Sequence, residues 1–218
     1  MLSVPDRWFP TFIDTNTRLL MKQNYSDVIE KLKKEGTTPV SDQVLLKFLE
    51  SAQEITLKRN QAIVDEGEIN SDIHIVREGV IRYCYQREGR DITAYFAMPA
   101  TPVCSYHSFC MNSPSFYRLE ACTKAKVLRI KKEDFLDMIR KSREFALWVI
   151  DILQCQLYFL EYKDKVITGN AADRLVSLFK NRPELLRAVS SKVIASYLGI
   201  TESYLSRLKR KLFEEDRF

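Results

Sequence analysis

The sequence predicts an α+β protein in which an antiparallel β-roll is flanked by helices and followed by a long helix and a helical C-terminal segment. Residues 53–131 contain short runs rich in Ile, Val, Tyr and Phe, which are typical of strands. Residues 145–166, "FALWVIDILQCQLYFLEYKDKV", are unusually apolar for an exposed helix. Residues 190–212, "SSKVIASYLGITESYLSRLKRKL", have the pattern of two short helices around one glycine.

Length and composition limit the class of protein. With 218 residues, 45% of them apolar, the chain is long enough for one large or two modest domains. No apolar run approaches the roughly 20 residues that span a bilayer, and "MLSVPDRWFP" lacks the blocks of a secretory signal. The five cysteines form no CxxC pair, which suits a reducing compartment. We therefore expect a cytoplasmic protein with no membrane partner.

The N-terminal part, residues 1–40, is predicted to be a helical extension. In "SDVIEKLKKEG", Ser26 is expected to cap the first turn and Gly36 to adopt the left-handed conformation after the last turn. A second helix is expected after Ser41, its predicted N-cap. Its apolar residues at helical spacing are Val44, Leu45, Phe48 and Leu49.

Residues 41–142 are predicted to form the roll. The strand-like runs are "AIVD", "IHIV", "VIRYCYQ", "ITAYFA" and "KVLRI". Gly67, Gly79 and Gly89 each follow a glutamate and lie 12 and 10 residues apart, the spacing of an antiparallel roll or sandwich. Gly89 in "REGRD" is the predicted tip of a hairpin.

Residues 143–168 are predicted to be a long dimerisation helix with a hinge. Its apolar face consists of Val149, Ile150, Leu153, Leu157 and Leu160, with Phe159 beside them. Such a face must be covered by its own domain or by a second copy of the chain. Because the strand region is too small to cover every side, we expect a homodimer. Gly169 and Asn170 interrupt the pattern and are interpreted as a hinge and a new N-cap.

The net charge is concentrated near the C-terminus. From Lys165 onward there are 11 Lys and Arg against 6 Asp and Glu, so residues 1–164 hold 23 of each and the whole excess of +5 lies in the last quarter. This asymmetry favours an acidic partner for that segment, nucleic acid being the commonest, although a basic face is also compatible with simple solvation.

Residues 169–218 are predicted to contain a helix-turn-helix. Ala195 is small where the second helix would cross the first, and Gly199 has the freedom that a left-handed turn needs. Thr201 is the predicted cap of the second helix, and Glu202 suits its positive end. The predicted apolar seam consists of Ile194, Leu198, Ile200, Leu205, Leu208 and Leu212.

The opposite face of the second helix carries short polar and guanidinium groups suited to base edges and phosphates. These are Ser203, Ser206, Arg207 and Arg210, flanked by Lys192, Lys209 and Lys211. The alternative is a helical hairpin with a solvated basic face. Because the small, turn, cap and apolar positions all agree, we favour DNA binding.

The order of these segments resembles the Crp/Fnr family of bacterial transcription regulators over about residues 40–213. The resemblance rests on "VDEGEINSDIHIVREGVIR", "NAADRLVSLF" and "IASYLGITESYLSRLKRKL". It implies a cyclic-nucleotide-binding-like jelly roll, a dimer along the long helix and a C-terminal winged helix-turn-helix. It further implies double-stranded DNA with an inverted repeat, a second copy of the chain and RNA polymerase as partners.

The resemblance also assigns residues. The family's base-contacting positions correspond to Glu202, Ser203, Ser206 and Arg207, and Arg207 matches the family's recognition arginine. The predicted DNA-binding set is Lys192, Thr201, Glu202, Ser203, Ser206, Arg207, Lys209 and Arg210.

Members of the family that bind cyclic AMP use a Gly-Glu pair and, about ten residues later, an Arg-Ser or Arg-Thr pair. Here Cys104 and Ser105 stand at the first pair and Ser115 and Phe116 at the second, so the fixed cation and the ribose acceptor are missing. We expect a different effector, more apolar and still unidentified, or none. The candidate pocket residues are Tyr95, Cys104, Ser105, Tyr106, Phe109, Ser115 and Phe116, although structural core is the simpler interpretation of the aromatic ones.

The sequence contains no Walker A loop, GxGxxG, HExxH or GxSxG motif, so we expect no catalytic residue and no enzyme. Cys104, His107 and Cys110 have a spacing that would permit a metal or haem, but packing is the preferred explanation, so no metal or cofactor is predicted. Two functions remain: a homodimeric regulator that reads DNA, or a sensor or interaction module that keeps the helix-turn-helix as scaffold.

Overall fold

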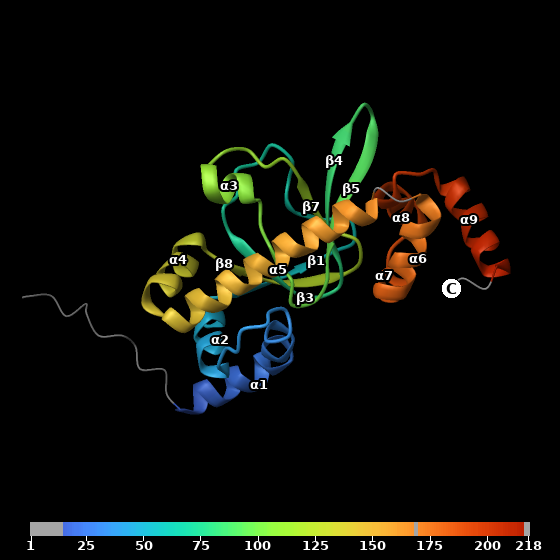
Figure 1. Cartoon of the computed structure of the whole chain (residues 1–218). Helices are drawn as coiled ribbons and strands as arrows, with labels where there is room; N and C mark the ends of the chain where they lie inside the picture. Colours follow the sequence, from blue (N-terminus) through green and yellow to red (C-terminus); the bar gives the residue numbers. More distant parts are fainter. Residues whose placement is uncertain (1–14, 168–169, 216–218) are drawn as a thin grey trace, which may run out of the picture.

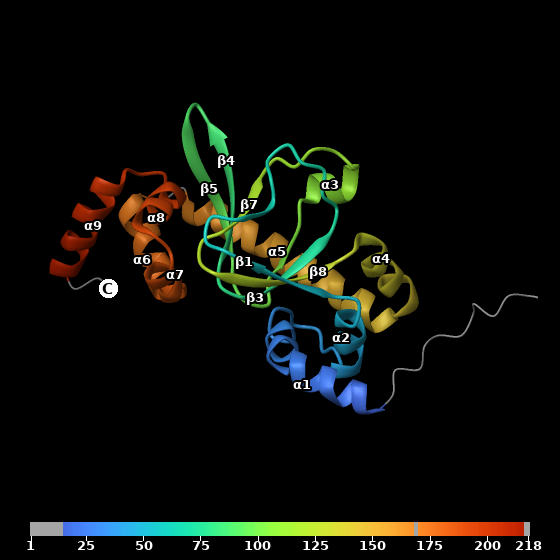
Figure 2. The same ribbon diagram turned by 180° about the vertical axis from the view of Figure 1, so that it is seen from behind.

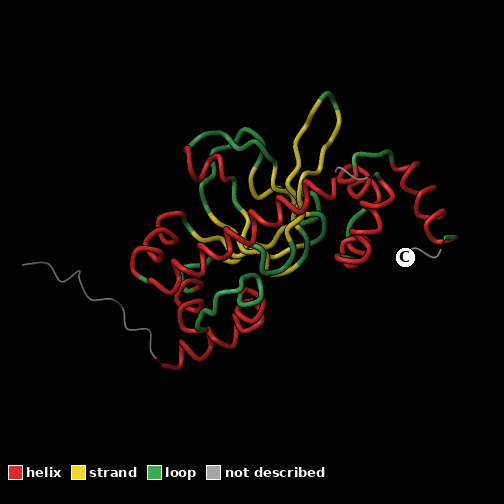
Figure 3. The backbone as a smooth tube through the Cα atoms, viewed as in Figure 1, coloured by secondary structure: helices red, strands yellow, loops and turns green. Residues whose placement is uncertain are grey.

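The structure is a computed structural model that describes residues 15–167 and 170–215 (Figure 1). Helices precede, interrupt and follow the strands (Figure 3). In chain order the elements are α1 (Thr15–Leu32), α2 (Asp42–Leu49), β1 (Gln53–Leu57), β2 (Ala62–Val64), β3 (Ile73–Glu78), β4 (Ile81–Arg87), β5 (Arg90–Ala97), β6 (Pro102–Val103), α3 (Tyr106–Met111), β7 (Arg118–Ala121), β8 (Ala125–Ile130), α4 (Lys132–Lys141), α5 (Arg143–Ile167), α6 (Ala171–Asn181), α7 (Pro183–Ala188), α8 (Ser191–Leu198) and α9 (Glu202–Glu214).

The strands form two four-stranded antiparallel sheets, ordered β1-β8-β3-β6 and β2-β7-β4-β5, and the predicted roll is confirmed. The β4–β5 hairpin turns at Glu88 and Gly89, whose φ angles are 52° and 73°, as the sequence predicts for Gly89. Alternate side chains fill the space between the sheets. That core includes Leu57, Val76, Ile81, Leu119 and Val127.

The N-terminal helix differs from the expectation. It begins at Thr15, so Ser26 lies inside the helix and does not cap it. Its inward residues include Val28 and Leu32, which share a core with Trp148 of α5. The segment is therefore built into the main core, which also contains Leu45, Phe48 and Leu49 of α2.

The loop after α1 contains a second difference. Gly36 is not among the residues with positive φ. Glycine is required at this position because the backbone passes close to α5, and a Cβ would collide with the carboxylate oxygen Oδ2 of Asp151. Ser41 caps α2 as predicted, since its side chain accepts from the Val44 N–H at 3.4 Å.

Helix α5 runs across the roll from α4 to the C-terminal helices, as both views show (Figures 1 and 2). Phe145 and Trp148 on its inner side are 0% and 2% exposed. No helix among the described residues is long and apolar enough to cross a membrane.

Helices α6 to α9 pack around their own apolar cluster, and Asn170 caps α6 by accepting from the Asp173 N–H at 3.0 Å. The cluster continues into the roll through Val80, Phe96, Met98 and Cys122. Between residues 170 and 215 every regular element is a helix, so the described part of this segment lacks the strands of the implied wing. Gly169, at the predicted hinge, lies outside the described residues.

Candidate nucleic-acid interface

Helices α8 and α9 form a helix-turn-helix with the predicted local chemistry. Gly199 between them has φ 66°, in the left-handed region where a Cβ is disfavoured. Thr201 caps α9 by accepting from the Tyr204 N–H at 3.2 Å, and Ser190 caps α8. The pair is held by buried residues of both helices, Ile194, Ala195, Leu198, Leu205, Leu208 and Leu212.

The outer face of α9 presents the polar residues predicted to read DNA. Thr201, Glu202, Ser203, Ser206, Arg207 and Arg210 are exposed, as is Lys192 on α8, whereas Lys209 is half-buried. The Arg207 guanidinium lies 5.9 Å from the centre of the Tyr204 ring, a cation–π contact between residues three positions apart on the helix surface. The Thr201 and Ser203 hydroxyls are 3.2 Å apart. The face therefore offers donors and acceptors within the first two turns of α9, where base edges are reached.

The outer face of α5 is a continuous apolar surface. Ile150, Leu153, Leu157 and Leu160 are 52%, 42%, 65% and 42% exposed, and Leu147 and Tyr158, which the sequence interpretation omitted, extend the surface. Val149 instead packs against the core beneath the helix. Exposed large apolar residues in such number on one helix face are typical of an interaction surface.

Several of the predicted effector residues lie close to Tyr83. Tyr95 belongs to a cluster with Tyr83, Tyr85 and Tyr117, whose ring centroids lie 5.7 to 6.1 Å apart. The Tyr83 hydroxyl accepts from the Cys104 N–H at 3.1 Å, and burial raises its pKa well above the usual value. Sequence reasoning missed Tyr83, Tyr85 and Tyr117, although the alternation in "YCY" places Tyr83 and Tyr85 on one face.

The remaining effector candidates lie in or near helix α3. Ser105 is buried and caps α3, and Ser115 is buried and donates to the Tyr117 carbonyl at 2.7 Å. Phe109 packs edge-on to Phe135 at 6.0 Å. Phe116 is 63% exposed and lies on the surface. Tyr106 is 53% exposed as a whole residue, but burial of its phenol group raises its pKa to about 12, and the nearby Cys104 and Cys110 act in the same direction.

Comparison with known proteins identifies the roll. Residues 54–142 match the family described as the cyclic nucleotide-binding domain. The roll is similar to that domain. The sequence matches no curated protein.

Solved structures extend the likeness beyond residues 54–142, and they show that the fold is that of Crp/Fnr-type regulators. FixK2 from Bradyrhizobium japonicum is 19% identical with a TM-score of 0.64, covering 76% of this chain and 86% of that one. The c-di-GMP-responsive global regulator CLP of Xanthomonas campestris is 13% identical with a TM-score of 0.62, covering 81% and 93%. The Thermus thermophilus catabolite activator protein is 18% identical with a TM-score of 0.51, covering 81% and 85%.

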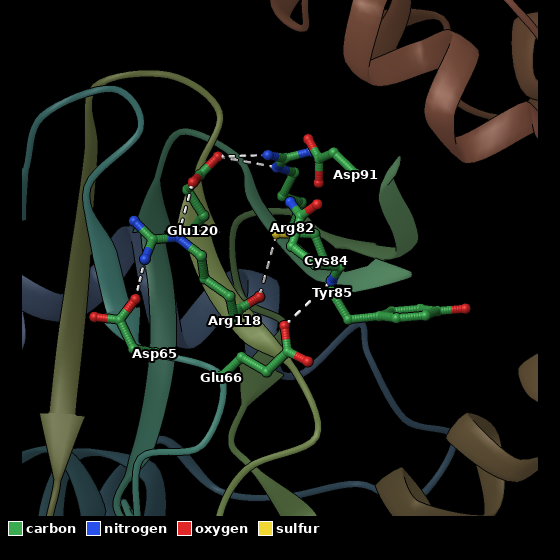
Figure 4. Close-up of a pocket in the computed structure, with 9 residues that line it drawn as sticks. Asp65, Glu66, Arg82, Cys84, Tyr85, Asp91, Arg118 and Glu120 are labelled. Atoms are coloured by element: carbon green, nitrogen blue, oxygen red, sulfur yellow. Dashed lines mark hydrogen bonds and ion pairs between the residues drawn. The ribbon is translucent and has the colours of Figure 1, made fainter. Parts of the chain in front are cut away.

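A polar cavity of about 470 Å³ opens beside β4 of the roll (Figure 4). Arg82 and Glu120 line this cavity. Arg82 Nε and Nη2 donate to Glu120 Oε1 at 3.0 and 2.8 Å. Arg118 donates to the other oxygen of Glu120 at 3.0 Å and to Asp65. Burial raises the pKa of Cys84 to about 12, so its thiol stays protonated. The lining is Asp65, Glu66, Arg82, Cys84, Tyr85, Gln86, Asp91, Arg118 and Glu120.

The spaced cysteines and histidine do not build a metal site. Cys104 is buried with its pKa raised to about 12, mainly by burial. His107 stacks on Phe116 at 3.9 Å, with Nδ1 2.8 Å from the Pro114 carbonyl oxygen. Within the described ranges no group of three or more His, Cys, Asp or Glu could hold a metal ion.

Proposed function

We propose that this chain is a sequence-specific DNA-binding transcription regulator that acts in the cytoplasm as a homodimer on an inverted-repeat operator. The observation that carries the proposal is the polar face of α9, where Ser203, Ser206 and Arg207 are exposed on a helix fixed by the Gly199 turn and the Thr201 cap. The fold, shared with Crp/Fnr-type regulators, supports transcription regulation as the class of function.

On this proposal α9 enters the major groove. Arg207 is assigned a bidentate contact to guanine, and Ser203 and Ser206 contact neighbouring bases. Glu202 is placed to accept from a cytosine amino group. Lys192, Lys209 and Arg210 are assigned to phosphates, which position the protein without reading sequence.

The apolar outer face of α5 supports the homodimer. Two copies related by a two-fold axis would cover Leu153, Leu157 and Leu160 on each helix, and burial of one leucine is worth about 1.5–3 kcal/mol. A two-fold dimer presents its two α9 helices to successive major grooves, roughly 34 Å apart, which requires an inverted repeat.

We propose that the effector, if the domain has one, is not cyclic AMP. The Ser105 hydroxyl accepts from the Ser108 N–H. Ser115, at the position where the phosphate-binding cation would be needed, is buried and donates its hydroxyl to the Tyr117 carbonyl, and Phe116 beside it is exposed.

The test is selection of random duplex DNA on the purified protein at fixed moderate salt. The native protein should enrich an inverted repeat, and Arg207→Ala should lose that preference while Arg187→Ala, which removes an exposed charge from α7, keeps it. Retention of DNA without any enriched sequence by the native protein would contradict the proposal and favour a scaffold role for the helix-turn-helix.

A further inference from the structure

The first helix of the helix-turn-helix is attached to the free edge of the roll. β5 is the edge strand of the sheet β2-β7-β4-β5. The Ser196 hydroxyl on α8 accepts from the Thr93 N–H at 2.8 Å and donates to the Asp91 carbonyl at 2.5 Å. One side chain thus satisfies a donor and an acceptor that an edge strand leaves open.

Apolar contacts reinforce this attachment. The rings of Phe96 on β5 and Tyr197 on α8 lie 5.0 Å apart. Val80 and Cys122 of the roll, 3% and 5% exposed, belong to the same buried cluster as Leu175 of α6. The helix-turn-helix is therefore held on the roll by a packed contact as well as by its chain connection to α5.

Arg82 holds in place the β5 residues that contact Ser196. Its guanidinium donates to Asp91 Oδ2 at 2.9 Å and to Thr93 Oγ1 at 3.0 Å, the two residues that contact Ser196. The ion pair with Glu120 anchors the Arg82 side chain (Figure 4). This side chain is 8% exposed. Arg82 is thus a positioning residue for the β5 edge.

The contact leaves the reading face open. It uses Ser196 and Tyr197 on α8, whereas Ser203 and Arg207 on α9 remain exposed. Attachment to the roll therefore does not prevent α9 from reaching a groove. It determines where α9 lies relative to α5, and so relative to the second α9 of a dimer.

We propose that the Ser196 contact with β5 determines the spacing between the two half-sites that this protein accepts. The inference rests on the proposed function, since it needs a dimer that reads two half-sites. An attachment to the roll, in addition to the chain connection with α5, restricts the two α9 helices to one separation. DNA recognition by paired helices depends on that separation matching the helical repeat.

The test uses the half-site enriched by the native protein, placed as an inverted repeat with every spacer from zero to about ten base pairs, one DNA turn. Native protein should recover one spacing or two adjacent ones. Ser196→Ala and Phe96→Ala should keep the half-site sequence, but their preference for the best spacing over its neighbours should fall about fivefold. Ser191→Ala, an exposed serine on the same helix, is the matched control and should leave the spacing unchanged.

A narrow, unchanged distribution in both interface variants would overturn the inference while leaving the proposed function standing. A second measurement needs no DNA: amide exchange of the Thr93 N–H should be slow in the native protein and at least tenfold faster in Ser196→Ala. Rapid exchange in the native protein would show that the contact does not persist in solution, and it would overturn the inference even if the native protein enriched an operator.

Discussion

The Asp151 carboxylate on α5 holds Thr37 of the preceding loop by two hydrogen bonds, from the Thr37 N–H at 2.6 Å and from its hydroxyl at 2.7 Å. The Thr38 N–H adds a third at 2.9 Å. Two turns earlier on α5, Glu144 accepts a hydrogen bond from the Ser41 N–H at 2.6 Å. Two carboxylates on α5 thereby fasten the N-terminal segment to the helix that also carries the exposed apolar surface.

Replacing Asp151 should loosen this segment. Hydrogen bonds from Thr38 and Thr37 lower the pKa of Asp151, so its contribution to stability is present at neutral pH and is lost as the pH falls through the folded-state pKa. Asp151→Asn should therefore lower the melting temperature at pH 7 and flatten its dependence on acid pH. Calorimetry measures both, with Glu161→Gln on the same helix as control. An unchanged melting temperature would contradict this role.

His74 should make the protein sensitive to mild acid. Burial lowers its pKa to about 4, with the Arg129 charge acting in the same direction and the Asp72 charge opposing it. The unfolded chain takes up a proton near pH 6.5, where the folded protein does not, so stability falls from pH 6.5 downward. The expected loss is about 2 kcal/mol between pH 6.5 and 5. Urea unfolding at a series of pH values should show this fall in the free energy of unfolding for the native protein and not for His74→Leu. If the free energy of unfolding of both proteins fell equally with pH, His74 would not be the cause.

Removal of Arg82 should destabilise the roll strongly. Arg82→Met removes the main partner of Glu120, whose side chain is 11% exposed, and a partner of Asp91, whose side chain is 29% exposed. Breaking a buried pair by removing one partner costs about 3–5 kcal/mol. Lys126→Met removes the exposed partner of Glu78 and should change stability little. Equal effects of the two substitutions in urea unfolding would refute the structural importance of this network.

A charge on the outer face of α5 should dissociate the dimer. Leu157→Glu places a carboxylate where the proposed interface buries leucine, and we expect the dimer dissociation constant to rise at least about tenfold. Sedimentation velocity over a concentration series measures it. Ile69→Glu, at an exposed aliphatic residue of the roll, is the matched control. A native protein that stays monomeric at all concentrations would contradict the dimer itself.

Cyclic AMP should bind weakly or not at all. The positions that would hold its phosphate and ribose carry Cys104, Ser105, Ser115 and Phe116, which supply neither a cation nor a carboxylate. Isothermal titration should show no dissociation constant below about 0.1 mM. A tighter complex would mean that another group, such as the tyrosine cluster around Tyr83, supplies the affinity.

The local elements were predictable where short-range chemistry decides them. Ser41, Asn170 and Thr201 cap helices in the structure because a side-chain oxygen followed by helix-forming residues needs only three residues to act. Gly89 and Gly199 adopt positive φ for the same local reason. The start of α1 at Thr15 was missed, since the helix continues through Ser26 and its inward face is stabilised by residues of α5 far along the chain.

The features of the candidate site also fall into those that local sequence predicts and those that depend on tertiary contacts. The sequence by itself determined the strand runs, the apolar face of the long helix and the polar face of α9, because periodicity and capping express themselves over a few residues. Only the tertiary structure decided that Gly36 faces Asp151, that the tyrosines pack on one another, and that Ser196 joins the edge of β5. Those relationships join residues between 12 and 115 positions apart, where packing and the pairing of buried polar groups, and not local propensity, select the partner.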